Sequence, residues 1–260
     1  IFSNSSVDNA GGLSIGKNVE DINGGAIKLY NSIIGENGAT DKGGGICTDS
    51  SVLMRNTSIN NNSSRNGGGL YIGNTATVHM WMGSYINNNY AYNNGGGVYI
   101  GEKANFLLTD NNIYQNNCAK NGMGVYVRGK FQMFSIASVD ESNEVYLTRQ
   151  TYISIIDRLL KPSGYVAVIR TTLTDPGTII AQVEYSTDAQ KELYYIGDAV
   201  AELNNQNCVK KFLVRNISGN KILRPTKFVK AYVDNEIIIS EKYDVTFNKN
   251  TSEHVLGMPE

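Results

Sequence analysis

Proline, histidine and cysteine are scarce in this chain of 260 residues, and neither sign of charge dominates. There are four Pro, two His and three Cys, and 23 basic against 24 acidic side chains give a formal net charge of −1. A near-neutral chain lacks the basic surface that captures nucleic acid or anionic membrane, so neither is an expected partner. No apolar run approaches the roughly 18 residues that a transmembrane helix needs.

The few His and Cys residues form no recognisable site. His79 and His254 have no Cys or His at ligand spacing, so the sequence predicts no metal and no cofactor. Cys47, Cys118 and Cys208 are an odd number without motif spacing, and we expect free or buried thiols.

Glycine and asparagine are unevenly distributed. Residues 1–130 hold 22 of the 27 Gly and 23 of the 32 Asn but none of the Pro. This shift predicts two regions, residues 1–142 and residues 143–260. Because the glycine-rich half also contains regularly spaced Val, Ile, Leu and Tyr, it does not have the composition of a disordered segment.

Five copies of a repeat occupy the first region. Each has an Ile-x-x-Asn unit, a glycine run and a short alternating segment, and successive Ile are 33, 25, 27 and 27 residues apart. The Ile-x-x-Asn units are Ile1–Asn4, Ile34–Asn37, Ile59–Asn62, Ile86–Asn89 and Ile113–Asn116. The glycine runs end at Gly12, Gly45, Gly69, Gly97 and Gly124.

Segments of period two in so short a repeat are typical of strands that cannot bury an apolar face alone. Stacking the copies about 4.8 Å apart encloses a continuous interior. The sequence therefore predicts an all-β fold, a right-handed parallel β-helix of the pectin-lyase-like type. In it Asn4, Asn37, Asn62, Asn89 and Asn116 form an amide ladder, and the glycines let the backbone turn and pass close to neighbouring coils.

The second region lacks the repeat but keeps strand signals up to Val183, which predict irregular coils on the same stack. Asp198–Leu203 is a short helix candidate, Lys210–Val214 reads as a strand, and a hairpin is expected around Asp234 and Asn235. We expect residues 143–260 to cap the open end of the solenoid, because exposed stacking strands invite edge pairing. Since Ile1 lies inside a coil, the natural protein is expected to extend further N-terminally.

The Gly-Gly-x-(Ile/Leu/Val) and Ile-x-x-Asn units resemble the repeats of the polymorphic outer-membrane proteins and of adhesin-like bacterial β-helix proteins. Ile stands here where that family usually has Phe. The resemblance covers about 150 residues. It implies a surface-displayed or secreted protein of the bacterial cell envelope. It does not identify a ligand.

Enzymes that process polysaccharides also use this fold, so paired carboxylates are the first chemistry to look for. Hydrolysis needs two or three acids on one face, one of them protonated. Residues 1–130 hold eight acids, and neither Asp49 nor Asp110 has an acid at the equivalent position of another repeat. The sequence therefore predicts no catalytic residues.

Aromatic residues give the one binding candidate. Tyr71, Tyr99 and Tyr126 occupy the same position in three successive coils and should form a column on an outer face, and Trp81 lies nearby in sequence. Two interpretations are open: such a column binds sugar rings or protein partners, or it only stabilises neighbouring strands. We expect a non-catalytic adhesin-like or stalk protein that binds host or bacterial glycans or surface proteins. The alternative is a polysaccharide-processing enzyme or a phage-type glycan-binding spike.

Overall fold

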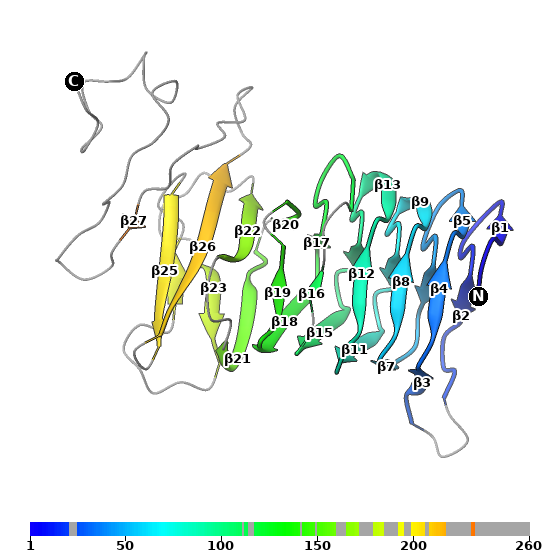
Figure 1. The fold of residues 1–260 in the computed structure, drawn as a ribbon, viewed down its shortest axis with the longest axis horizontal. Coiled ribbons are helices and arrows are strands. Elements are labelled where there is room, and N and C mark those ends of the chain that lie inside the picture. Colours follow the sequence, from blue (N-terminus) through cyan, green and yellow to red (C-terminus); the bar gives the residue numbers. More distant parts are fainter. Residues whose placement is uncertain are drawn as a thin grey trace, which may run out of the picture.

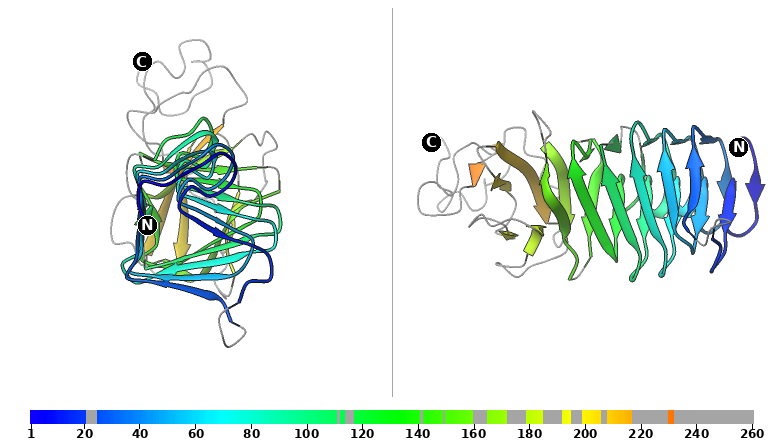
Figure 2. Two further views of the ribbon diagram at one scale, coloured as in Figure 1. Left: turned by 90° about the vertical axis from the view of Figure 1, so that its right-hand side faces the viewer. Right: turned by 90° about the horizontal axis from the view of Figure 1, so that it is seen from below.

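The computed structural model is a right-handed parallel β-helix, with coils stacked along one long axis (Figure 1). It describes residues 1–20, 25–110, 112–113, 117–140, 142–148, 150–159, 165–171, 179–184, 192–194, 199–205, 208–216 and 230–231. Within these ranges the regular elements are all strands. Seen along the axis, successive coils superimpose around one interior (Figure 2).

Four sheets make up the walls, and each coil of the repeat region contributes a strand to most of them. The ten-stranded sheet contains β2 (Leu13–Ile15), β6 (Ile46–Thr48), β10 (Leu70–Ile72), β14 (Val98–Ile100), β17 (Val125–Val127), β20 (Glu144–Leu147), β22 (Tyr165–Thr171), β26 (Cys208–Asn216), β25 (Ala199–Asn205) and β27 (Lys230–Ala231). The eight-stranded sheet contains β3 (Ile27–Tyr30), β7 (Val52–Arg55), β11 (Thr77–Trp81), β15 (Asn105–Thr109), β18 (Lys130–Ser135), β21 (Ile153–Leu159), β23 (Ile179–Val183) and β24 (Glu192–Tyr194).

Two smaller sheets complete the coils. The five-stranded sheet contains β4 (Ile33–Gly35), β8 (Ser58–Asn60), β12 (Tyr85–Asn87), β16 (Asn112–Ile113) and β19 (Ser138–Val139). The four-stranded sheet contains β1 (Ser5–Ser6), β5 (Gly38–Ala39), β9 (Ser63–Asn66) and β13 (Tyr90–Asn94).

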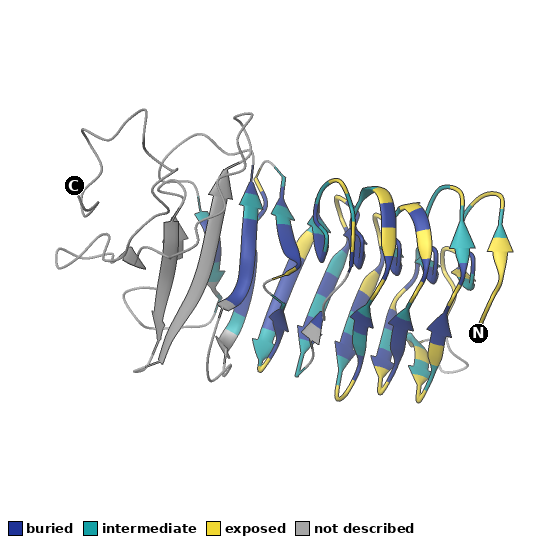
Figure 3. Ribbon diagram, turned by 45° about the horizontal axis from the view of Figure 1, so that its top comes forward, coloured by how far each residue is buried: buried dark blue, intermediate teal, exposed yellow. Residues whose placement is uncertain are grey.

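The core is a set of apolar columns, because parallel pairing in register places equivalent residues above one another. Ile34, Ile59, Ile86 and Ile113 pair in this way, and each is at most 1 % exposed. The rings of Phe106 and Phe131 stack with centroids 5.7 Å apart in the next column. Buried residues line the strands and exposed ones gather at the turns and the first coil (Figure 3).

The predicted amide ladder is present, with one correction. Each ladder Asn donates its Nδ2 to the Oδ1 of the Asn in the next coil, from Asn4 to Asn37, Asn62 and Asn89, at 2.9–3.0 Å. In the fifth coil the acceptor is Asn117, 3.0 Å from Asn89 Nδ2. The predicted Asn116 lies outside the described residues, and one extra residue in this coil shifts the position to Asn117. We call Asn4, Asn37, Asn62, Asn89 and Asn117 the asparagine ladder.

The last glycine of each run lies against this ladder. A Cβ built on Gly69 would come within 3.0 Å of the Asn89 side chain and 2.8 Å of the Gly97 carbonyl oxygen. Gly45 is similarly close to Asn62, and Gly97 lies 3.4 Å from Asn117 by the same measure, whereas Gly124 abuts Val139 and Asn143. The glycines therefore allow neighbouring coils to approach closely, as the repeat predicts.

Parallel stacking continues beyond the repeats and then changes character. β20 and β22 extend the ten-stranded sheet, and β21 and β23 extend the eight-stranded one. The helix predicted at Asp198–Leu203 is wrong: β25 is a strand that pairs antiparallel with β26 through seven residue pairs. Pairing with a long neighbouring strand outweighs the weak local helix preference of this segment. The hairpin expected around Asp234 and Asn235 falls outside the described residues.

Candidate binding surface

A column of tyrosines runs along the outer face of the ten-stranded sheet. Tyr71, Tyr99, Tyr126 and Tyr146 are paired residue by residue through β10, β14, β17 and β20. Their rings stack with centroid separations of 4.7, 5.3 and 5.1 Å and interplanar angles of 9°, 18° and 26°. We call these four residues the tyrosine column. The structure thus brings together the three tyrosines that the repeat predicts.

Sequence reasoning missed the fourth member, Tyr146. It lies in Val145–Leu147, a segment with the same alternation as Val125–Val127. The signal was available, but the glycine run that marks the other copies is absent before it.

Ring faces inside the column are covered by neighbouring rings. Tyr99 is only 8 % exposed, because Tyr71 and Tyr126 stack on its two sides. A partner can therefore reach mainly the ring edges and hydroxyl groups in the middle of the column. The stacking itself supports the stabilising interpretation of the repeat, since aromatic cross-strand pairs contribute to sheet stability.

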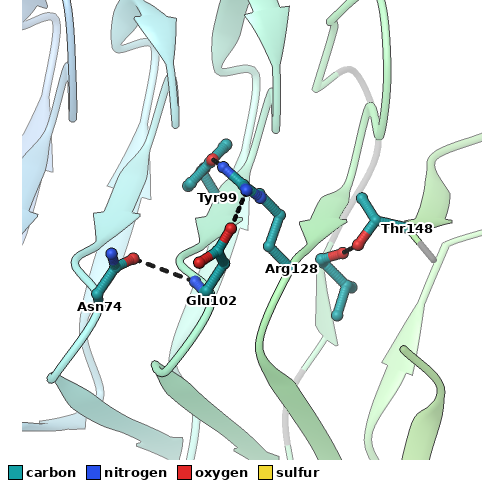
Figure 4. A network of polar contacts seen from close by, with 6 residues as sticks. Asn74, Tyr99, Glu102, Arg128 and Thr148 are labelled. Atoms are coloured by element: carbon teal, nitrogen blue, oxygen red, sulfur yellow. Dashed lines mark hydrogen bonds and ion pairs between the residues drawn. The ribbon is translucent and has the colours of Figure 1, made fainter. Parts of the chain in front are cut away.

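A polar network flanks the column (Figure 4). Arg128 donates from Nη1 to the Tyr99 hydroxyl at 3.3 Å and forms an ion pair with Glu102 through Nη2. The backbone N–H of Glu102 donates to Asn74 Oδ1 at 3.1 Å. Arg128 thereby ties the middle of the column to the adjoining turn.

Trp81 does not join the column. It lies on β11 in the eight-stranded sheet, where Arg55 is 5.9 Å from its ring centre and the His79 ring is 6.0 Å away. Proximity in sequence suggested a shared surface, but the turn between β10 and β11 directs the two strands onto different walls. Burial lowers the pKa of His79, which leaves this ring neutral near pH 7.

The column ends at Tyr71, where the next residues in register are much smaller. Cys47 pairs with Tyr71, and Ser14 pairs with Cys47. A surface pocket of about 250 Å³ opens at this step, lined by Asn9, Lys17, Lys42, Cys47, Asp49, Tyr71, Gly73, Asn74 and Thr75. We call it the end pocket. It had no signal in the sequence, because residues from three coils meet there.

Charges of both signs surround the end pocket. The Lys42 ammonium lies 5.5 Å from the centre of the Tyr71 ring and 3.6 Å from an Asp41 carboxylate oxygen. Burial, and then the neighbouring Tyr99, raise the pKa of Tyr71 to about 12. Burial and then Asp49 raise the pKa of the Cys47 thiol to about 11. At neutral pH both are uncharged, so the Cys47 thiol is a poor nucleophile.

Several described carboxylates are held by basic side chains. Glu102 pairs with Arg128, Glu144 with Arg170 at 2.8 Å, and Glu184 with Lys130 at 2.8 Å. Burial acts to raise the pKa of Glu184, but hydrogen bonds from Lys130 and Ser154 outweigh it and the pKa is lowered. A general acid needs the opposite shift.

Within the described ranges, no group of three or more His, Cys, Asp or Glu is placed to hold a metal ion. The same residues include no helix long and apolar enough to cross a membrane. No protein-family model, curated protein or solved structure matches this chain.

Proposed function

We propose that this chain is a non-catalytic β-helix protein of the bacterial surface or the extracellular space. Its role is adhesin-like or structural, and it binds a glycan or a protein through the face that carries the tyrosine column. The observation that carries the proposal is the column itself, four stacked rings in register on one wall. Rigid amphipathic area of this kind is common in binding surfaces. The location rests on the resemblance of the repeats to those of surface-displayed proteins.

The acids support the non-catalytic part. Glu102, Glu144 and Glu184 are each neutralised by a basic partner, an arrangement that lowers rather than raises a carboxyl pKa. Glycoside hydrolysis needs a second carboxyl that stays protonated.

One observation favours a polysaccharide-processing enzyme as the second candidate. Asp49 shares the end pocket with Lys17 and Lys42, and an acid beside a base is a minimum for proton transfer. The pocket contains a single acid, however, which is fewer than hydrolysis requires.

The test incubates the protein with a panel of host and bacterial glycans and matrix proteins and follows retention and cleavage together. Retention without cleavage supports the proposal, and release of shortened products overturns it. The triple variant Tyr71→Ala, Tyr99→Ala, Tyr126→Ala should lose retention, with folding verified by circular dichroism.

Because Tyr99 is buried, Tyr71→Ala and Tyr126→Ala are also measured singly. Tyr92→Ala serves as the matched control, since Tyr92 is 71 % exposed and lies on β13 in another sheet. Folded column variants that retain the ligand as well as the Tyr92 variant would show that the column is structural only.

A further inference from the structure

The end pocket differs from the rest of the tyrosine column in leaving a ring face without a stacked neighbour. Tyr71 stacks on Tyr99 on one side, but on the other the register residue is Cys47. Lys42 belongs to the same coil as Cys47, so it approaches Tyr71 from the side opposite Tyr99. The pocket of about 250 Å³ is smaller than a drug-sized site and suits a single six-membered ring.

Two acceptors in the pocket lack partners among the described residues. Asn9 Oδ1 is buried without a hydrogen bond. The Asp49 carboxylate receives no hydrogen bond and no ion pair, and it lies directly over Gly73, where any larger side chain would overlap it. Buried acceptors normally have a donor, so a ligand with hydroxyl groups would complete this site.

The lining also carries more positive than negative charge. Lys17 and Lys42 stand against Asp49, which leaves a net charge of +1. This balance suits a ligand with one negative charge, and Asp49 would repel a group that carries more. Lys ammonium groups form their stronger hydrogen bonds with carboxylates.

We propose that the end pocket binds a carboxylated sugar, a uronic acid unit of an acidic polysaccharide. Its carboxylate pairs with Lys42 and Lys17, its hydroxyls donate to Asp49 and Asn9 Oδ1, and its apolar face lies toward Tyr71. Asn74 supplies an amide at the same rim of the pocket. This inference deepens the proposed function and rests on it, because it specifies the glycan and the part of the surface that holds it.

The test is calorimetric titration with a galacturonic acid tetrasaccharide and with a glucuronic acid tetrasaccharide at low salt. The methyl ester of each serves as a matched neutral probe. We expect the acid forms to bind at least about tenfold more tightly than their esters, a difference of about 1.4 kcal/mol. Equal binding of acid and ester, or no binding of either acid, would overturn the assignment.

Charge variants locate the site. Lys42→Met and Lys17→Met should each weaken binding of the acid probe by about tenfold. Asp49→Asn should weaken the acid and its ester alike, because it removes a hydroxyl acceptor. Lys120→Met is the control, since Lys120 is exposed and outside the pocket. Lysine variants that bind like this control would also overturn the assignment.

The two proposals fail in different ways. If the acid probes are ignored but another glycan is retained through Tyr126, the pocket assignment fails and the proposed function stands. If either tetrasaccharide is shortened, the non-catalytic function fails, whatever the affinity.

Discussion

Asn62 and Asn89 are joined by two hydrogen bonds to a single atom. Asn89 Oδ1 accepts from both the backbone N–H and the Nδ2 of Asn62, each at 3.0 Å. Asn62 Nδ2 also donates to the Ile34 carbonyl, and Asn89 Nδ2 to that of Ile59. Each ladder amide thus satisfies backbone groups at a corner where the sheets leave them unpaired.

Asn89→Ala should be far more costly than Asn4→Ala. Asn89 is 1 % exposed, and its removal leaves buried groups of Asn62 and Asn117 without a partner. We expect a loss of about 3 kcal/mol in the free energy of unfolding. Asn4 is exposed and has a ladder neighbour on one side only, so its loss should be below about 1 kcal/mol. Urea denaturation of both variants measures this, and equal costs would argue against the ladder.

Gly69→Ala should destabilise the coil stack, whereas Gly16→Ala should not. A methyl group on Gly69 meets the Gly97 backbone and the Asn89 amide, and nothing lies within 4 Å of the same position on Gly16. We expect a cost of about 2 kcal/mol or more at Gly69. At Gly16 we expect a change within about 0.5 kcal/mol, or a small gain from a stiffer unfolded chain. Thermal unfolding compares the two, and similar melting temperatures would contradict the close approach.

Tyr99→Phe and Tyr99→Ala separate ring stacking from the hydroxyl contact. Phenylalanine keeps both stacked neighbours and loses the hydrogen bond from Arg128, which we expect to cost under about 1.5 kcal/mol. Alanine opens a gap in the middle of the column and should cost about 3 kcal/mol. Denaturant midpoints of the two variants decide this. If Phe is as harmful as Ala, the hydroxyl network and not the stack holds this wall together.

High pH should weaken the fold through Tyr71. Its pKa is raised to about 12, above the value near 10 expected in the unfolded chain. The folded state therefore favours the protonated phenol. This contribution is fully present below about pH 10 and is lost as the pH rises toward 12. Tyr126 shifts in the same direction.

The measurement is the melting temperature across this alkaline range, together with ultraviolet titration of the tyrosines. The variant Tyr71→Phe should lose part of the pH dependence. An unchanged melting temperature from about pH 9 to pH 12 would contradict the burial of Tyr71.

The repeat predicted the stack because parallel pairing turns equal spacing in sequence into alignment in space. That logic gave the asparagine ladder and Tyr71, Tyr99 and Tyr126. It failed where spacing changed: one extra residue in the fifth coil moved the ladder from Asn116 to Asn117.

The end pocket could not be predicted in the same way. It arises where side chains are small, at Cys47 and Ser14, and where turn residues from three coils meet. A repeat pattern records what each coil has in common, whereas this pocket depends on how neighbouring coils differ. Trp81 illustrates the converse error, because closeness along the chain was mistaken for closeness on one surface.

The parallel pairing between coils has a mechanical consequence. Hydrogen bonds from one coil to the next run along the axis of the rod, so tension on the two ends of the stack loads them in series. The terminal coil, with one neighbour, would peel first. Coils of 25 to 33 residues would each release roughly 80–120 Å of chain. Stretched from its ends, the molecule would therefore lengthen in discrete steps and dissipate work at each one.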